Sequence, residues 1–189
     1  MSQTLDTSSQ LILLLGGARA GKSAHALRLA PVRQRSSGAK VCFIATAQPL
    51  DEDMTARITR HREQRPSDWQ TIEEPYQIDG ALRQAGEAGV VIVDCLTLFV
   101  SNWLLRYDEE QECETVVRQI TGKFLQLARS RGQTIICVSN ETGLGVVPET
   151  RLGRVFRDLL GRVNQDFSEA ADEVYLLVAG LPLQLKPSA

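Results

Sequence analysis

The sequence predicts an α/β protein with a largely parallel sheet flanked by helices. Short β-branched runs alternate along the chain with amphipathic stretches of helix length, and this alternation is typical of repeated strand–helix units. The expected strands are continuously apolar, which indicates burial on both faces. A chain of 189 residues is long enough for one core. We therefore expect a flexible tail over residues 1–10 and one domain over residues 11–189.

The expected strands are the apolar runs that turn signals or polar residues bound. The first is the uninterrupted run Leu-Ile-Leu-Leu-Leu, and the third is Val-Val-Ile-Val ending on an aspartate. In chain order the expected strands are Leu11–Leu15, Val41–Thr46, Val90–Asp94, Thr134–Asn140 and Glu173–Val178, with a short edge strand near Leu183–Lys186.

The expected helices are the amphipathic stretches between those strands. Pro66 supports a stop after the second of them. Flexibility is expected in the tail 1–9, in the loop 33–38 and in the last residues 187–189. In chain order the expected helices are Lys22–Ala30, Glu52–Gln64, Ile78–Ala88, Glu109–Arg131 and Arg151–Ala171.

Composition favours small-molecule partners. The net charge is −2, from 21 basic and 23 acidic residues, so no global positive field attracts nucleic acid or an anionic membrane. The longest apolar runs have strand length and the N-terminus lacks a basic region, so we expect no signal peptide, no membrane span and a cytoplasmic protein. The cysteines form no C-x-x-C pair and lie mostly in apolar runs, which favours reduced, buried thiols over disulfides or zinc ligands.

A phosphate-binding loop is the strongest motif. The pattern G-x-x-x-x-G-K-[ST] is matched directly after the first expected strand. Its glycines allow backbone N–H groups to close around phosphate oxygens. Lys22 is suited to reach the β- and γ-phosphates, and the Ser23 hydroxyl to ligate Mg²⁺. The loop residues are Gly16, Gly17, Ala18, Arg19, Ala20, Gly21, Lys22 and Ser23. The motif predicts a nucleotide-binding protein.

Asp94 is a candidate partner of this loop. It ends a hydrophobic strand, and open α/β sheets place their ligand sites at that end. A carboxylate there can hold or orient the Mg²⁺ that bridges the phosphates. A capping aspartate in a surface turn is the alternative. Thr97, three residues later, offers a hydroxyl near the same position.

His61 is the more suggestive of the two histidines. Arg57, His61 and Arg65 recur at intervals of four residues, which stacks them on one face of the expected helix. Neighbouring cations disfavour the imidazolium, so His61 would stay neutral and available as a nucleophile or base. From composition alone, a solvated arginine-rich face with an uninvolved histidine is the simpler interpretation. His25, two residues after Ser23, is expected to be structural.

These motifs belong to a longer pattern. The chain resembles the bifunctional adenosylcobinamide kinase / adenosylcobinamide-phosphate guanylyltransferase family of cobalamin biosynthesis. The resemblance runs from about Leu11 to Lys186. Besides the P-loop, it rests on the blocks at 44–47 (Ile-Ala-Thr-Ala), 51–58, 61–66 (His-Arg-Glu-Gln-Arg-Pro), 69–73, 94–97, 101–102, 138–149 and 161–165.

The resemblance implies a RecA-like P-loop fold and two reactions. ATP or GTP would phosphorylate adenosylcobinamide, and GTP would then transfer GMP to that phosphate through a histidine–GMP intermediate. The guanylylated histidine would be His61, with Lys22 and Asp94 as the other catalytic residues and Ser23 and Asp94 as Mg²⁺ ligands. The remaining nucleotide contacts would be Ala45, Thr46, Ala47, Arg62, Glu63, Gln64, Arg65 and Glu73, the last at the base edge. The family also implies a homotrimer.

Several interpretations stay open at the level of sequence. The segment Asn140–Glu149 is either a loop that closes on the corrinoid or an ordinary strand-to-helix connection. Trp69 and Trp103 are expected in the core or at a subunit interface rather than beside the corrin ring. Asp94 is the first candidate for the kinase base. Two functions are alternatives to the bifunctional enzyme: a P-loop kinase without nucleotidyl transfer, and a non-catalytic nucleotide switch.

Overall fold

The computed structural model describes residues 9–34 and 39–187. Over these residues it forms a seven-stranded sheet in the order β3-β2-β4-β5-β1-β6-β7. All neighbouring strands pair in parallel except β6 and β7, which are antiparallel. The strands are β1 (Gln10–Gly16), β2 (Val41–Ala45), β3 (Gln70–Glu73), β4 (Val90–Asp94), β5 (Thr134–Val138), β6 (Glu173–Val178) and β7 (Leu181–Lys186). The carboxyl ends of the parallel strands therefore meet at one edge.

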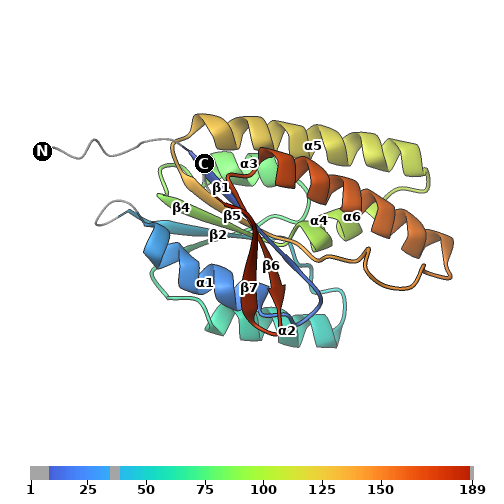
Figure 1. Ribbon diagram of the computed structural model, residues 1–189, viewed down its shortest axis with the longest axis horizontal. Helices are drawn as coiled ribbons and strands as arrows, with labels where there is room; N and C mark the ends of the chain where they lie inside the picture. The colour runs from blue at the N-terminus through green and yellow to red at the C-terminus, as the bar shows by residue number, and fades with distance from the viewer. Residues whose placement is uncertain (1–8, 35–38, 188–189) are drawn as a thin grey trace, which may run out of the picture.

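Helices cover both faces of the sheet (Figure 1). α1 and α2 lie on one side, and α3, α4, α5 and α6 lie on the other. The helices are α1 (Lys22–Arg33), α2 (Glu52–Glu63), α3 (Ile78–Gln84), α4 (Leu96–Leu104), α5 (Glu110–Ser130) and α6 (Arg151–Ala170). The sheet is thus the middle layer of three.

Alternate residues of the central strands face the two helical layers. Leu11 and Leu13 of β1 belong to the larger core cluster, with Phe99 and Phe124 from the helices on that side. Ile12 and Leu14 belong to the second cluster, on the side of α1. Because side chains alternate along a strand, a continuous apolar run serves both cores.

Most predicted elements are confirmed, with limited differences. The structure adds β3 and α4, which the sequence analysis did not predict. β5 ends at Val138, two residues early, and α3 ends at Gln84. Burial on both faces holds for β1, β2, β4 and β5, but it is wrong for β7, whose residues are all exposed. β7 is exposed because it is an edge strand that pairs with β6 alone.

Some predictions fall outside the described residues. These are the flexible tail over residues 1–8, the loop residues 35–38 and the last residues 188–189. Arg33, expected in the loop, instead ends α1 and forms an ion pair with Glu173 at 2.7 Å. Within the described ranges, no helix is both long and apolar enough to cross a bilayer.

Candidate active site

The P-loop joins β1 to α1 with backbone that only glycine adopts readily. Gly16 has φ +149°, and a Cβ atom there would lie 2.5 Å from the carbonyl oxygen of Leu177. Gly21 has φ +89°, and its Cβ would approach the Cα of Gly180 to 3.2 Å. The amide of Gly180 also donates to the carbonyl of Ala20 at 3.1 Å. The turn between β6 and β7 therefore packs against the loop and fixes its shape.

Lys22 is held by the loop's own backbone. Its Nζ donates to the carbonyl oxygens of Gly16 at 2.9 Å and Gly17 at 2.6 Å. Burial lowers the pKa of Lys22, and the carboxylate of Asp94 acts in the opposite direction. Ser23 is half-buried at the first turn of α1. Both side chains lie where a nucleotide's phosphates would meet the positive end of α1.

Asp94 ends β4 on the same edge of the sheet. One of its carboxylate oxygens, Oδ2, is buried and has no hydrogen-bond partner in the protein. Its negative charge raises the pKa of Lys22 against the effect of burial. A buried carboxylate oxygen without a donor is costly, and a Mg²⁺ ion would relieve that cost because hard cations prefer oxygen ligands.

The end of β2 lies beside Asp94 and is fixed by buried polar contacts. The Thr46 hydroxyl accepts from the amide of Cys95 and donates to its carbonyl, both at 2.8 Å. Asn102 of α4 donates through Nδ2 to the carbonyls of Thr46 at 2.8 Å and Pro75 at 3.1 Å. The Thr46 amide also donates to the carbonyl of Asp94 at 3.2 Å, so both the side chain and the backbone of Thr46 are occupied by contacts within the protein.

His61 reaches the site from α2. Asp51 caps this helix by accepting from the amide of Met54 at 2.6 Å. Met54, Ile58 and His61 are half-buried and define its inner face, while Arg57 is exposed. Their spacing is that of one helical stripe.

The surroundings of His61 favour its neutral form. Burial lowers the pKa of His61, and the cations of Arg57, Arg65 and Arg60 act in the same direction. Asp94 opposes them. Since Asp94 also acts on the pKa of Lys22, the strand-end carboxylate lies close to both the P-loop lysine and the histidine.

Arg65 lies on the same side of the site as His61, but outside α2. α2 ends at Glu63 and Gln64 is its C-cap, so Arg65 lies beyond the helix and its expected stacking on the helix face is wrong. The guanidinium lies over the ring of Phe43, with Cζ 3.7 Å from the centroid. Its Nε and Nη1 are buried without a partner. These two nitrogen atoms are therefore available to donate to a ligand's oxygen atoms.

The other predicted nucleotide contacts spread around this centre. Arg62 and Glu73 form an exposed ion pair with each other, and Glu63 and Gln64 are exposed. Ala18 and Arg19 lie at the exposed tip of the P-loop. Sequence reasoning assigned no role to Phe43 or Asn102. Phe43 is one apolar residue among several in its strand, and nothing marks it as a platform for an arginine.

The segment after β5 connects to the P-loop. The amide of Glu141 donates to the carbonyl of Gly16 at 3.1 Å, and the amide of Asn140 donates to the Thr97 hydroxyl at 2.7 Å. Thr97 is therefore committed to this segment. No helix or strand occurs over 139–150.

Trp103 is buried, as expected. Its indole N–H donates to the carbonyl oxygen of Tyr76 at 3.0 Å.

The cysteines are free thiols, in agreement with the sequence analysis. Cys42, Cys113 and Cys137 are buried and Cys95 is half-buried. Burial raises the pKa of Cys42 to about 11, and burial together with Asp94 raises that of Cys95 to about 11. Among residues 9–34 and 39–187, no three His, Cys, Asp or Glu side chains are grouped as metal ligands.

Comparison with known proteins identifies this arrangement. The family model described as cobinamide kinase / cobinamide phosphate guanyltransferase matches residues 12–185. The chain belongs to this family. Its P-loop lies within the match, so the enzyme uses nucleoside triphosphates, and cobinamide is the acceptor that the family description names.

Two curated relatives cover almost the whole chain. The bifunctional adenosylcobalamin biosynthesis protein CobP of Pseudomonas aeruginosa is 44% identical, over 92% of this chain and 96% of its own. The corresponding protein CobU of Escherichia coli is 37% identical, over 93% of this chain and 99% of its own. These matches extend across the P-loop, α2 and the segment after β5.

Solved structures confirm the P-loop NTPase fold expected for this cobinamide kinase family. The flagellar accessory protein FlaH of Methanocaldococcus jannaschii superposes with a TM-score of 0.52 at 16% identity, covering 96% of this chain and 80% of its own. A central strand, β5, separates the P-loop strand β1 from β4, as expected for the RecA-like type. This likeness concerns the fold alone.

Proposed function

We propose that this enzyme carries out both reactions at the P-loop edge of its sheet. ATP or GTP phosphorylates the hydroxyl of adenosylcobinamide, and GTP then transfers GMP to that phosphate, giving adenosylcobinamide-GDP and pyrophosphate. One observation carries the proposal: the P-loop backbone holds Lys22 at the edge of the sheet where β4 ends on Asp94, whose buried Oδ2 has no partner. The electrostatic effects of Asp94 on Lys22 and on His61, directions taken from their pKa shifts, are consistent with it. The names of the relatives, adenosylcobalamin biosynthesis proteins, support a place in that pathway, and we propose a cytoplasmic enzyme.

His61 is the proposed nucleophile of GMP transfer. A neutral imidazole nitrogen attacks the α-phosphorus of GTP, the bond to the bridging oxygen breaks, and pyrophosphate leaves. An oxygen of the cobinamide phosphate then attacks the same phosphorus and releases the imidazole. The lowered pKa of His61 supports this role, because only the neutral ring has a free electron pair at neutral pH.

Cations and amides around His61 would stabilise the phosphates. Lys22 and the P-loop amides face the β- and γ-phosphates, and the free N–H groups of Arg65 suit oxygens near the attacked phosphorus. The buried Oδ2 of Asp94 and the Ser23 hydroxyl fit Mg²⁺, which would neutralise charge on the departing phosphates. The proposed nucleotide contacts are residues 16–23, Ala45, Thr46, Ala47, Arg62, Glu63, Gln64, Arg65, Glu73 and Asp94.

In the kinase step the acceptor hydroxyl must lie in line with the γ-phosphorus. Asp94 is the proposed group that orients it or accepts its proton. Phosphoryl transfer through a loose transition state needs little help from a base, so positioning by Asp94 and Lys22 would suffice.

We also propose that residues 11–189 act as one catalytic domain that assembles as a homotrimer. The exposed apolar side chains of β7, among them Leu181, Leu183 and Leu185, support an interface, because monomers seldom expose large apolar patches.

The test is covalent labelling by GTP that carries a label on its α-phosphate. We expect acid-labile label on His61 in the unchanged protein, no label in His61→Ala, and full label in His25→Ala, which removes the other histidine. In His61→Ala, phosphorylation of cobinamide should persist. Equal labelling of His61→Ala would exclude the histidine intermediate, and kinase activity without any labelling would favour a kinase that lacks nucleotidyl transfer.

A further inference from the structure

We propose that the corrin ring of the substrate docks on an apolar patch at the start of α6. The patch, here the α6 patch, consists of Leu144, Val146, Val147 and Leu152. This inference rests on the proposed function and locates its acceptor: the nucleotide binds at the P-loop, and the ring rests beside it on the segment that follows β5.

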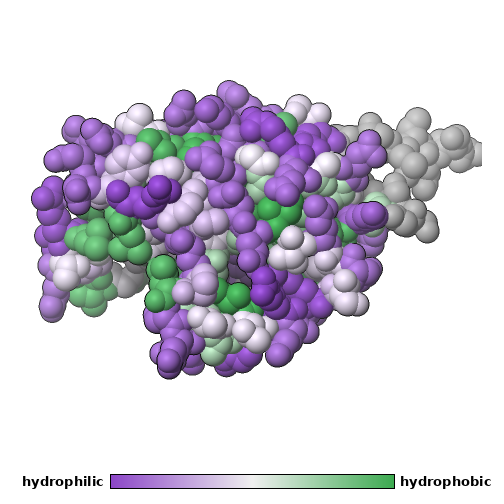
Figure 2. Space-filling model, turned by 180° about the vertical axis from the view of Figure 1, so that it is seen from behind, coloured by the Kyte–Doolittle hydropathy of each residue, from purple (hydrophilic) through white to green (hydrophobic). Residues whose placement is uncertain are grey.

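The α6 patch is unusually exposed for its composition. Val146 is 95% and Leu144 84% exposed, and Val147 and Leu152 each expose more than half of their surface. Figure 2 shows hydrophobic residues gathered at the left end of the molecule, the end where α6 begins, beside a notch in the surface. Apolar residues clustered in this way commonly mark a binding surface.

The backbone that carries the patch is held at both ends. At its start, the amide of Glu141 donates to Gly16 of the P-loop at 3.1 Å. At its end, Nη1 of Arg154 donates to the carbonyls of Pro148 at 3.1 Å and Glu149 at 2.7 Å. The apolar side chains are therefore presented to solvent by an anchored segment, and they are not the tip of a frayed loop.

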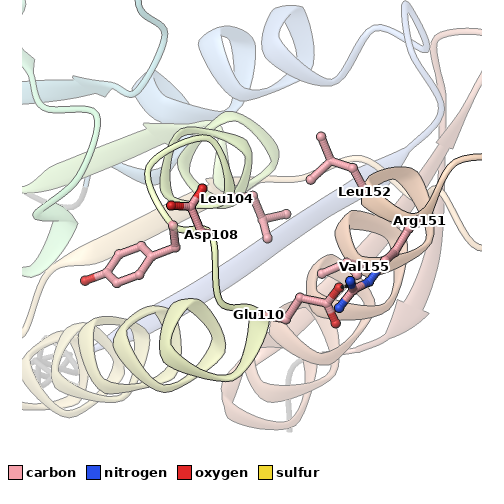
Figure 3. Close-up of a pocket in the computed structure, with 7 residues that line it drawn as sticks. Leu104, Asp108, Glu110, Arg151, Leu152 and Val155 are labelled. Carbon is pink, nitrogen blue, oxygen red and sulfur yellow. Dashed lines mark ion pairs between the residues drawn. The ribbon is translucent and has the colours of Figure 1, made fainter.

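A pocket continues the patch between α4, α5 and α6. It has a volume of about 260 Å³, and Leu152 belongs to both the patch and its lining. Leu104, Leu152 and Val155 supply its apolar side, whereas Glu110 and Arg151 form an ion pair at 2.7 Å at its edge (Figure 3). A surface with apolar centre and charged edge is complementary to a macrocycle with methyl groups on its faces and amides at its rim.

The position of the α6 patch also favours the corrin ring as the molecule that binds there. The hydroxyl that is phosphorylated hangs from the macrocycle on a flexible arm and must reach the P-loop, so the ring must lie within one arm's length of it. The segment leaves the P-loop at Gly16 and Glu141, and Leu144 follows three residues later. A nucleotide has no need for this surface, because its phosphates require the amides and cations already described.

The test compares Leu144→Ser/Val146→Ser with Val32→Ser. Val32 is another strongly exposed apolar residue, 77% accessible, at the C-terminal end of α1. We expect the KM for cobinamide in the double variant to rise about tenfold or more, since each residue loses apolar contact with the ring. The KM for GTP and the labelling of His61, which needs GTP alone, should not change. Val32→Ser should match the unchanged protein in the KM for cobinamide, in the KM for GTP and in the labelling of His61.

Other outcomes would overturn the proposal in distinguishable ways. If the double variant keeps the cobinamide KM, the ring docks elsewhere. If it instead lowers the mass of the assembly in solution with an unchanged KM, the patch is a contact between copies of the chain. If the unchanged protein is labelled by GTP but fails to bind cobinamide in equilibrium dialysis followed by its visible absorbance, the acceptor is a different molecule. If neither labelling nor binding occurs, the proposed function itself fails.

Discussion

At the scale of single residues, the site combines side chains whose present surroundings are unfavourable. Arg65 has two buried nitrogen atoms without a partner, Nε and Nη1, and Asp94 has one buried oxygen in the same condition. Each unmet group costs about 1–3 kcal/mol. Their charges act on each other, yet no hydrogen bond joins them. Such groups are expected where a ligand supplies the missing partners.

Replacing Arg65 should therefore separate stability from activity. The Arg65→Met variant keeps an apolar side chain over Phe43 and removes the unpaired donors. We therefore expect the free energy of unfolding to rise by roughly 1 kcal/mol. Labelling of His61 should slow about a hundredfold. Urea unfolding and single-turnover labelling measure the two quantities, with Arg28→Met, an exposed arginine of α1, as control. A clear loss of stability in Arg65→Met would show that the guanidinium is a structural group.

The pH dependence of labelling should reflect the lowered pKa of His61. The ring must be neutral to attack, and its pKa lies below the ordinary value of about 6.5, so the rate should stay constant through neutral pH and fall only on the acid side of that value. Arg57→Gln removes one of the like charges, which should raise the pKa and move the acid limb to higher pH. A limb that stays in place, or that moves to lower pH, would contradict this electrostatic account.

The sequence offers clearer signals for candidate reactive side chains than for the residues that support them. The roles predicted for Lys22, His61 and Asp94 rest on residue types and spacing that are chemically distinctive. The four-residue spacing placed Arg65 on the face of the helix, although the expected helix, to Gln64, and the observed one, to Glu63, both end before it. The aromatic ring beneath it could not be predicted, because the pairing of Arg65 with Phe43 joins residues 22 positions apart through the tertiary fold.

At the scale of elements, the two that were missed have weak sequence signals for opposite reasons. β3 contains a single buried residue, Ile72, in the pattern of an exposed edge. α4 is so apolar that no polar face marks its period, and seven of its nine residues are buried. Both nevertheless shape the site: β3 carries Glu73, and α4 holds the end of β2 through Asn102. The central strands were predictable because their continuous apolar runs match their burial on both faces.

α2 should be the helix that opens most readily among those near the site. None of its residues is fully buried, so its N-terminal cap contributes a large share of its stability. We expect Asp51→Ala to cost about 1 kcal/mol locally and to speed amide hydrogen exchange in α2 roughly fivefold. Asp51→Asn keeps a capping oxygen and should exchange like the unchanged protein. Equal exchange in all three proteins would mean that packing of Met54 and Ile58 alone holds the helix.

At the scale of the whole molecule, the sheet has one protected edge and one open edge. β3 at one end is short, whereas β7 at the other end exposes Leu181, Leu183 and Leu185. Long apolar edge strands invite pairing with another chain. Because Gly180 beside β7 contacts the P-loop, an assembly through this edge would place the nucleotide sites near the boundary between subunits.

Light scattering should detect that assembly. The mass of one chain is 20.9 kDa, and we expect a particle of about three times that mass. Leu183→Lys should reduce the particle toward one chain, since a charge on an exposed strand disfavours edge contacts. Val32→Lys, with the same change on α1, should keep the full mass. A monomer in the unchanged protein would exclude the trimer and leave the β7 edge unexplained.

With Lys22 as the proposed phosphate contact, its hydrogen bonds to Gly16 and Gly17 would make nucleotide binding an exchange reaction. An incoming phosphate must take the ammonium group from two backbone carbonyls, which then have to find water or other donors. The heat measured when a nucleotide binds is consequently a difference between two sets of contacts of similar kind. Calorimetry on this enzyme will understate how strongly Lys22 holds phosphate, and a triphosphate analogue that leaves the lysine on its carbonyls could bind almost as well while remaining inert.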